Sequence, residues 1–190
     1  MSLRTFIAVA ASPQVRSAAV KLMNRLRISS AATGVKWVAA ENLHWTLQFL
    51  GDVDERDIPE VCQAVATAAT ECEAFDIEAR GAGAFPSADR PRTLWIGAGQ
   101  GSREMALLQT AVERRLRKRG YRCEERRFVP HITLGRAGRQ GQPQSLASEL
   151  AELHDYDAGS MLVDEVTVYS SQLGPDGPAY DVLARAPLAE

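Results

Sequence analysis

The sequence predicts an α+β protein made of two structurally similar lobes. Segments with the two-residue alternation of strands and segments with helical spacing follow one another, and their order nearly repeats in the second half. Each half also contains one His-x-Thr-Leu segment, HWTL at residues 44–47 and HITL at residues 131–134. No linker-like stretch separates the halves, so we expect one bilobal domain over residues 1–190 rather than two independent domains.

The first elements can be placed from local signals. LRTFIAVA, at residues 3–10, alternates like a strand, and Ser12 followed by Pro13 supplies the cap and first turn of a helix. Gly34 marks a turn. VKWVAAENLHWTLQFLG then gives a short extended piece and the first histidine-bearing strand, which ends at Gly51.

A second helix, a pair of strands and a third helix are expected next. Asp54 or Asp57 could cap a helix that runs past Val65, and FDIEARGAGAFPSADRPRTLWIGAG indicates two strands around a Gly- and Pro-rich connection. The third helix starts at Arg103 and ends at RKRGY, where cations in the last turn and Gly120 form a favourable C-terminus.

The remaining elements follow the second histidine-bearing strand. GRAGRQGQPQS, residues 135–145, has the composition of a surface loop, and SLASELAEL has a weak helical pattern. MLVDEVTVYSSQL is interpreted as one strand, and GPDGPA turns the chain into a last strand, YDVLARAPL.

The first histidine-bearing strand separates two kinds of side chain. A period of two residues predicts a core face of Leu43, Trp45, Leu47 and Phe49 and a polar face of His44, Thr46 and Gln48. Same-face neighbours on a strand lie about 6.6 to 6.8 Å apart, so a histidine and a threonine at this spacing project into one small space. The second motif repeats this arrangement. A lone histidine on a strand is most often structural, but the duplication indicates chemistry.

Two such strands facing each other would place two imidazoles and two hydroxyls around a cleft. Imidazole titrates near neutral pH, so one ring can remove a proton while the other delivers one. The hydroxyls can donate hydrogen bonds to an oxyanion. This set fits phosphodiester cleavage, because a proton leaves the attacking oxygen, another reaches the leaving oxygen, and the nonbridging oxygens need donors.

The two motifs resemble the two-histidine phosphoesterase superfamily, whose signature is a pair of His-x-Thr/Ser-x tetrapeptides. The blocks WVAAENLHWTLQFLGDVDE, GAFPSADRPRTLWIG, RFVPHITLGR and SSQLGPDGPAYDVLARAPL resemble the bacterial RNA 2',3'-cyclic phosphodiesterases, also called 2'-5' RNA ligases. The resemblance implies two pseudo-symmetric lobes, each an antiparallel sheet with helices on its outer face, around a central cleft. It also implies hydrolysis of RNA or nucleotide 2',3'-cyclic phosphate ends to 2'-phosphates, without a metal or other cofactor.

The resemblance assigns roles by position. His44 would be the proton donor to the leaving 3' oxygen, and His131 would be the proton acceptor that activates water. Thr46 and Thr133 would bind the substrate phosphate, and Arg136 would add a cation to the developing charge.

Two positions depart from the simplest pattern. Strict alternation from the second histidine turns Arg136 toward the core side, so the strand must bend or end near Gly135 for Arg136 to reach the cleft. Trp45 stands where the family has an aliphatic residue, and its side chain is expected to pack in the core.

Other interpretations of the same residues stay open. The site could join RNA ends through a 2'-5' bond, or the chain could be a noncatalytic module that holds RNA or nucleotide phosphate ends. Paired histidines could also hold zinc, but neither motif has further ligands at short spacing, so no metal is expected. His154 has no threonine partner and is expected to be structural or on the surface.

Cations and aromatic residues outside the motifs have two interpretations each. A cluster of eight cations could attract an RNA backbone or form a solvated helix face, and the glutamates among them favour the helix face. The cluster consists of Arg114, Arg115, Arg117, Lys118, Arg119, Arg122, Arg126 and Arg127. Five aromatic residues could stack on a base but are expected mainly in the core. They are Trp37, Phe85, Phe128, Tyr169 and Tyr180.

The bulk composition limits location and partners. The formal net charge is −2, which argues against a protein that coats nucleic acid. Cys62, Cys72 and Cys123 form no CxxC pair, which favours a reducing cytoplasm over a disulfide framework. No apolar stretch is long enough to span a membrane, and no signal peptide is recognised. We expect a monomer without an obligate protein partner, because no long exposed apolar stripe is evident.

Overall fold

The structure is a computed structural model that describes residues 1–122, 127–138, 144–174 and 177–189. Its strands are β1 (Ser2–Ala10), β2 (Val35–Trp37), β3 (His44–Asp54), β4 (Phe75–Pro86), β5 (Pro91–Ala98), β6 (His131–Ala137), β7 (Asp157–Val163), β8 (Glu165–Gly174) and β9 (Gly177–Pro187). Its α-helices are α1 (Pro13–Arg27), α2 (Ile58–Ala69), α3 (Ser102–Arg117) and α4 (Ala147–Ala151). None of these helices is both long and apolar enough to cross a membrane.

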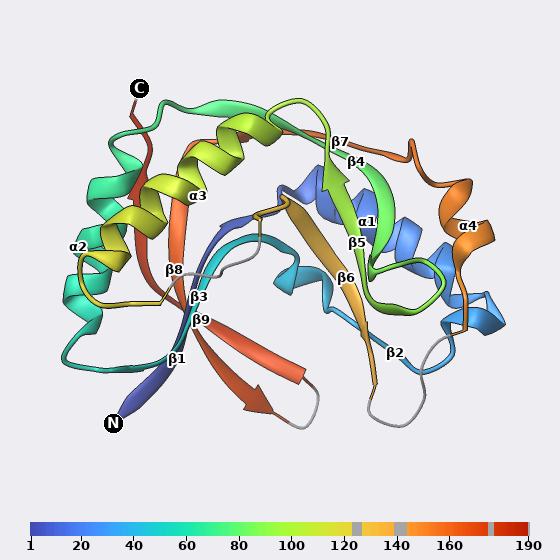
Figure 1. Cartoon of the computed structure of the whole chain (residues 1–190), viewed down its shortest axis with the longest axis horizontal. Coiled ribbons are helices and arrows are strands. Elements are labelled where there is room, and N and C mark those ends of the chain that lie inside the picture. Colours follow the sequence, from blue (N-terminus) through green and yellow to red (C-terminus); the bar gives the residue numbers. More distant parts are fainter. Residues whose placement is uncertain (123–126, 139–143, 175–176, 190) are drawn as a thin grey trace.

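The strands form one antiparallel sheet whose order separates the two lobes. The order is β7-β4-β5-β6-β3-β1-β8-β9. The short strand β2 pairs with the C-terminal end of β6, beyond the point where β3 pairs with it. Strands β1, β3, β8 and β9 make one lobe, which α2 and α3 cover, while β4 to β7 make the other, where α1 packs against β7 (Figure 1). The predicted α+β fold of two antiparallel lobes is therefore confirmed.

The two histidine-bearing strands are the central neighbours in this order. They meet at one residue pair, Trp45 opposite Ile132. Each of these residues directly follows the histidine of its motif. The junction between the lobes therefore lies where the two motifs lie.

Local sequence signals account for the helices. The Ser12 side chain accepts a hydrogen bond from the Val15 backbone N–H, which caps α1 as the Ser-Pro pair predicts. Asp57 occupies the N-cap position of α2 without a side-chain hydrogen bond to the helix. Helix α3 ends on a basic last turn, and Gly120 follows with a φ of 85°, a left-handed conformation that glycine adopts without strain.

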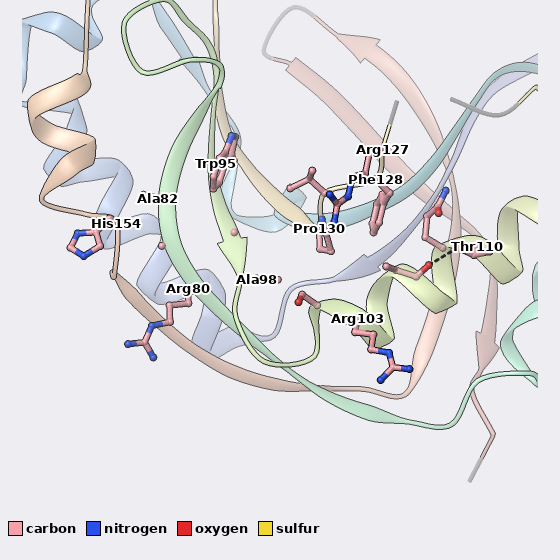
Figure 2. Close-up of a pocket in the computed structure, with 16 residues that line it drawn as sticks. Arg80, Ala82, Trp95, Ala98, Arg103, Thr110, Arg127, Phe128, Pro130 and His154 are labelled. Carbon is pink, nitrogen blue, oxygen red and sulfur yellow. Dashed lines mark hydrogen bonds between the residues drawn. The ribbon is translucent and has the colours of Figure 1, made fainter. Parts of the chain in front are cut away.

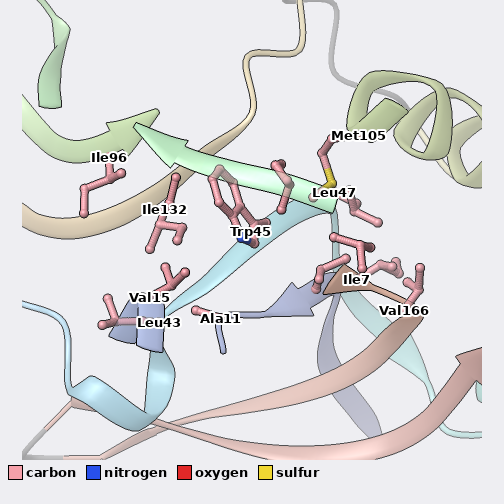
Figure 3. Close-up of a cluster of buried hydrophobic side chains, with 14 of the residues drawn as sticks. Ile7, Ala11, Val15, Leu43, Trp45, Leu47, Ile96, Met105, Ile132 and Val166 are labelled. Carbon is pink, nitrogen blue, oxygen red and sulfur yellow. The ribbon is translucent and has the colours of Figure 1, made fainter. Parts of the chain in front are cut away.

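The core lies beneath the junction of the two lobes. Trp45 is fully buried, and Ile132 and Ile96 are buried beside it (Figure 3). Val15 of α1 and Met105 of α3 belong to the same cluster, so helices of both lobes share one core. Burial of Trp45 confirms its predicted place and leaves His44 and Thr46 on the opposite face of β3.

Four element predictions need correction. The first histidine-bearing strand, expected to end at Gly51, continues to Asp54 as β3. The single strand expected over residues 161–173 is interrupted at Asp164, and its halves are β7 and β8. Strand β7 pairs with β4 in one lobe and β8 with β1 in the other, so the chain must change lobes at this point. The helix expected in SLASELAEL is only the short α4. The loop predicted at residues 135–145 starts later than expected, because β6 continues to Ala137, and residues 139–143 lie outside the described part.

Candidate active site

The pair Trp45–Ile132 fixes how the two motifs face each other. In antiparallel strands, one step forward along one strand corresponds to one step backward along the other. The Trp45–Ile132 register therefore sets His44 toward Thr133 and Thr46 toward His131. Each histidine is thus directed at the threonine of the other motif. The arrangement has approximate two-fold symmetry, which follows from the matched spacing of the motifs.

A β-bulge in β6 brings Arg136 to the histidine face. Leu94 of β5 pairs with Gly135 and Trp95 pairs with Thr133, which leaves Leu134 as an extra residue of β6. The extra residue resets the alternation, so Arg136 lies on the same face as Thr133. The bend that the sequence requires near Gly135 is therefore present, and its physical form is this bulge.

Strand β3 contains the equivalent bulge, which the alternation pattern did not predict. Ala8 of β1 pairs with Thr46 and Ile7 pairs with Gln48, so Leu47 is the extra residue. Gln48 consequently turns to the core side, where it is buried, and Phe49 turns to the histidine face with 47% of its surface exposed. The predicted face of Phe49 was wrong, because alternation was continued through a residue that has no partner in β1. Gln48 also leaves the strand face of His44, but it still lines the cavity that Thr46 and His131 line.

Gly135 allows β2 to lie close to the bulged strand. A Cβ atom at this position would be 2.6 Å from Cγ1 of Val35 and 3.2 Å from the Lys36 carbonyl oxygen. Strand β2 pairs with β6 there, with Trp37 opposite Gly135 and Lys36 opposite Arg136. The absence of a side chain therefore lets β2 support the backbone that carries Arg136.

Both motif histidines are oriented through the same ring nitrogen. Nδ1 of His44 lies 2.6 Å from the Asn42 carbonyl oxygen, and Nδ1 of His131 lies 2.7 Å from the Val129 carbonyl oxygen. A carbonyl oxygen only accepts, so Nδ1–H is the donor in each contact. In the neutral rings this tautomer leaves Nε2 without a proton, as a general base requires.

Burial lowers the pKa of His44 below its ordinary value of 6.5. The positive charges of Arg136 and His131 lower this pKa further, and the hydrogen bond to the Asn42 carbonyl opposes the shift. The Trp45–Ile132 pair and the β6 bulge place these three groups on one face of the sheet at the lobe junction. The substrate-free site therefore favours the neutral form of His44.

Four of the five predicted site residues line one cavity of about 360 Å³. They are Thr46, His131, Thr133 and Arg136. His44 is not among its lining residues but lies two positions before Thr46 on the same face of β3. A volume of this size is at the lower end of what small-ligand sites have.

Aromatic rings flank the two histidines on opposite sides. The ring centroid of His44 is 5.1 Å from that of Phe6 and 5.6 Å from that of Tyr180. Tyr169 stacks on Phe6 at 5.1 Å, and Phe85 meets His131 edge-on at 5.1 Å. Four of the five aromatic residues singled out in the sequence thus lie at or beside the site, since Phe128 also lines the cavity. Trp37 instead packs against the Arg27 guanidinium.

Four members of the basic cluster fall into two groups. Arg114 and Arg115 form ion pairs with Glu71, and Arg117 pairs with Glu113, as a solvated helix face would. Arg127 lies apart from these and lines the 360 Å³ cavity. Arg126 and Cys123 lie outside the described residues.

Several lining residues had no signal in the sequence. The fold alone brings three of them to the cavity, Thr93 of β5, Gln109 of α3 and Phe49 of β3.

The third histidine lies outside this cavity. His154 is exposed, and its Nδ1 lies 2.8 Å from the Ala151 carbonyl oxygen. Among the described residues, no group of three or more potential metal ligands comes together.

Comparison with family models matches both halves of the chain. The model described as LigT like Phosphoesterase matches residues 9–95 and again residues 96–180. The chain belongs to the LigT-like phosphoesterase family. Each match contains one His-x-Thr motif. The same family model therefore describes both halves of the chain, as the internal repeat in the sequence predicts.

Relatives of known name match over nearly their whole length. A protein of Aeropyrum pernix named RNA 2',3'-cyclic phosphodiesterase is 40% identical over 84% of this chain and 90% of its own. A protein of Thermotoga maritima with the same name is 35% identical, over 95% of this chain and 93% of its own.

Solved structures of the family share the fold. The protein TT0787 of Thermus thermophilus superposes with a TM-score of 0.79 and 27% identity, covering 98% of both chains. E. coli LigT complexed with 3'-AMP superposes with a TM-score of 0.74 and 26% identity, covering 100% of both chains. These neighbours confirm the two-lobed fold class of the family.

Proposed function

We propose that this chain hydrolyses terminal 2',3'-cyclic phosphates of RNA or nucleotides to 2'-phosphates. The supporting observation is that two His-x-Thr faces from distant parts of the chain, together with Arg136, meet at one site. The names of its family relatives, RNA 2',3'-cyclic phosphodiesterase, support the same reaction.

The proposed reaction divides proton transfer between the two histidines. Nε2 of His131 accepts a proton from water as the water oxygen attacks phosphorus. The bond from phosphorus to the 3' oxygen breaks, and Nε2 of protonated His44 delivers a proton to that oxygen. The products are a 2'-phosphate and a free 3'-hydroxyl, and proton release from His131 and uptake by His44 restore the site.

The remaining polar groups act on the nonbridging oxygens. Thr46 and Thr133 donate hydrogen bonds to them, and Arg136 supplies a charge-assisted donor. The lowered pKa of His44 bears on this assignment, because the acid must be protonated. The anionic phosphodiester offsets the positive charge of Arg136, so substrate binding raises the pKa of His44 toward the range in which it carries a proton.

The substrate is an RNA end or a cyclic nucleotide, and the structure of E. coli LigT complexed with 3'-AMP supports a nucleotide as the ligand.

The chain acts as a single bilobal domain, because both lobes contribute to one site and one core. It acts as a cytoplasmic monomer. Free Cys62 and Cys72 support that compartment, and the exposed large apolar side chains are scattered over several elements, which supports a monomer.

Incubation of the purified protein with a 2',3'-cyclic nucleotide in excess chelator tests this proposal. The expected product is the 2'-phosphate isomer, identified against both authentic isomers. Replacing His44 or His131 with Ala should each reduce turnover by about 10² to 10⁴ while circular dichroism reports a folded chain. Binding without turnover would instead identify a noncatalytic phosphate-binding module, and loss of turnover in chelator would require a metal.

A further inference from the structure

The carbonyl oxygen that orients His44 belongs to a residue with a second, long-range contact. Asn42 ends the short 3₁₀ turn η2 (Ala40–Asn42), and its carbonyl oxygen lies 2.6 Å from Nδ1 of His44. Its side-chain Nδ2 donates a hydrogen bond of 2.8 Å to the carbonyl oxygen of Pro178 in β9. One residue therefore connects the proposed general acid to a strand that lies 136 positions later in the chain.

The backbone of η2 by itself holds this carbonyl only weakly. The Asn42 carbonyl and the Leu43 N–H belong to one peptide plane, so they turn together. The Leu43 N–H donates to the Ala40 carbonyl oxygen at 3.3 Å, which is longer than the usual range of about 2.7 to 3.2 Å. The side-chain bond from Asn42 to Pro178 is shorter, at 2.8 Å. Loss of the amide would therefore leave the direction of the carbonyl to the longer bond.

Strand β9 also contacts the His44 ring directly. Tyr180, two residues after Pro178, meets this ring edge-on with centroids 5.6 Å apart. Tyr180 packs edge-on against Phe6 as well, at 4.8 Å, and Phe6 lies 5.1 Å from His44. Strands β1 and β8 separate β9 from β3 in the sheet order, so these contacts depend on the tertiary fold. The aromatic rings limit the position of the imidazole, and the Asn42 carbonyl sets its rotation.

The carbonyl oxygen that orients His131 is held differently. It belongs to Val129, whose side chain has no hydrogen-bonding group. Residues 127–129 line the 360 Å³ cavity and also a neighbouring cavity of about 960 Å³, which Pro130 lines too (Figure 2). Open space thus borders this segment in two cavities, whereas η2 is bonded to β9. The two proton-transfer groups are supported unequally.

A firm hold on the ring matters for a general acid. The acid nitrogen must come within about 2.6 to 3.2 Å of the leaving oxygen, and a displacement of about 1 Å can reduce the rate about 10²-fold. The hydrogen bond to the Asn42 carbonyl also raises the pKa of His44, against the larger effect of burial. Among the described residues, the charged or titratable groups around this ring are Arg136 and His131 of β6 and Tyr180 of β9.

We propose that Asn42 is a positioning residue of the reaction, which holds its carbonyl oxygen against His44 by binding the Pro178 carbonyl of β9. The inference rests on the proposed function and on its assignment of His44 as the acid. Asn42 is not among the residues that line the 360 Å³ cavity, so it acts through His44 and not on the phosphate. Strand β9 thereby takes part in proton delivery to the 3' oxygen.

A sulfur leaving group tests this role, because it removes the need for an acid. In a 2',3'-cyclic nucleotide with sulfur in place of the 3' oxygen, the bond from phosphorus to sulfur breaks and a thiolate leaves. A thiol has a pKa of about 8.5, far below that of an alcohol, so the thiolate needs no proton from His44. Asn42→Ala should lower kcat about tenfold with the oxygen substrate but less than about twofold with the sulfur substrate. KM should change little with either.

NMR titration gives a second measurement on the same variant. In Asn42→Ala the pKa of His44 should fall, because the carbonyl that favours the imidazolium is no longer held against Nδ1. The pKa values of His131 and His154 should not change, since each ring is oriented by a different carbonyl oxygen. A general loss of stability would not produce this selective shift.

Control variants separate the amide from its surroundings. Asn42→Leu keeps side-chain bulk without a donor and should behave like Asn42→Ala. Asn24→Ala is the matched control, because Asn24 is the chain's only other asparagine, lies exposed on α1 and accepts a hydrogen bond from Arg27. It should match wild type with both substrates. The sulfur substrate should restore most of the activity that His44→Ala loses, but not that of His131→Ala.

Three outcomes would overturn the inference. Wild-type kcat in Asn42→Ala would show that the amide is not needed, and an equal loss with both substrates would show that the defect is not in proton delivery. Restoration of His131→Ala instead of His44→Ala by sulfur would reverse the two histidine roles and remove the basis of the inference. Absence of cyclic nucleotide hydrolysis by the wild-type protein would contradict the proposed function itself.

Discussion

Phe49 and Arg136 occupy equivalent positions in the two lobes, each five residues after the histidine of its motif. In both strands one extra residue, Leu47 or Leu134, resets the alternation so that this fifth residue turns to the histidine face. Both side chains line the 360 Å³ cavity. The pseudo-symmetric fold thus presents an aromatic ring from one lobe and a cation from the other.

This asymmetry suits an asymmetric ligand. A guanidinium favours the phosphate, whereas a half-exposed ring offers its face to a base. Phe6 supports the Phe49 ring at a centroid distance of 5.7 Å, which limits the side-chain freedom that a ligand would have to remove.

Replacement of Phe49 with Ala should lower kcat/KM for a 2',3'-cyclic nucleotide about tenfold, because loss of one base-stacking partner costs about 1 to 3 kcal/mol. Steady-state kinetics should assign most of the loss to KM. Leu107→Ala is the matched control, because Leu107 is also largely exposed, at 56%, and does not line the 360 Å³ cavity. Equal losses in the two variants would show that Phe49 acts through general stability.

Replacement of Arg136 with Gln should raise the pKa of His44, because the guanidinium charge disfavours the imidazolium. Titration of the His44 ring proton signals by NMR should give a pKa below 6.5 in the wild-type protein and a higher one in the variant. Since the folded pKa lies below the unfolded one, His44 should also lower stability as the pH falls through 6.5, and this loss should be smaller in the variant. An unchanged His44 titration in Arg136→Gln would contradict the placement of the two groups in one site.

Replacement of Thr133 with Val should lower kcat by about 10² to 10³ if its hydroxyl binds the oxyanion, while Thr133→Ser retains most activity. Thr46→Val should behave alike, because the register places Thr46 at the equivalent point beside His131. Valine keeps the shape of threonine, so thermal unfolding should change little. Full kcat in both valine variants would exclude the two hydroxyls from the reaction.

Replacement of Gly135 with Ala should push β2 away from β6, because the added methyl would meet Cγ1 of Val35 at 2.6 Å. Overpacking of this kind costs about 1 to 3 kcal/mol, and movement of Arg136 should lower kcat/KM as well. The double variant Gly135→Ala with Val35→Ala should recover part of both losses, since it removes the nearest clashing atom. A double variant no better than Gly135→Ala would locate the effect in the Lys36 carbonyl oxygen and the Trp37 ring, each 3.2 Å from the added methyl, rather than in Val35.

Much of the fold and site followed from local signals. The Ser12 cap, the helical spacing after it and the glycines at turns predicted elements that the structure contains, because these signals act over a few residues. The histidine and threonine pairs were equally visible, since a repeated spacing on a strand needs no partner to be recognised. Burial of Trp45 was predictable from alternation for the same reason.

The predictions that were wrong concern residues whose place depends on another strand. Gln48 and Phe49 exchanged faces because Leu47 has no partner in β1. The chain changes lobes at Asp164 because β7 and β8 pair with different strands. The sequence carried a local sign of this change, since the buried Val163 and the buried Val166 are out of phase with each other across Asp164 and Glu165.

The amino-acid sequence by itself determined the order of elements, the duplicated His-x-Thr faces and the chemistry that they can perform. Only the tertiary structure decided that Trp45 lies opposite Ile132 and that Phe49 joins Arg136 at the cavity. The reason is physical. Alternation and capping are local, whereas an extra residue in a strand and the wall of a cavity exist only relative to segments that are distant in the chain.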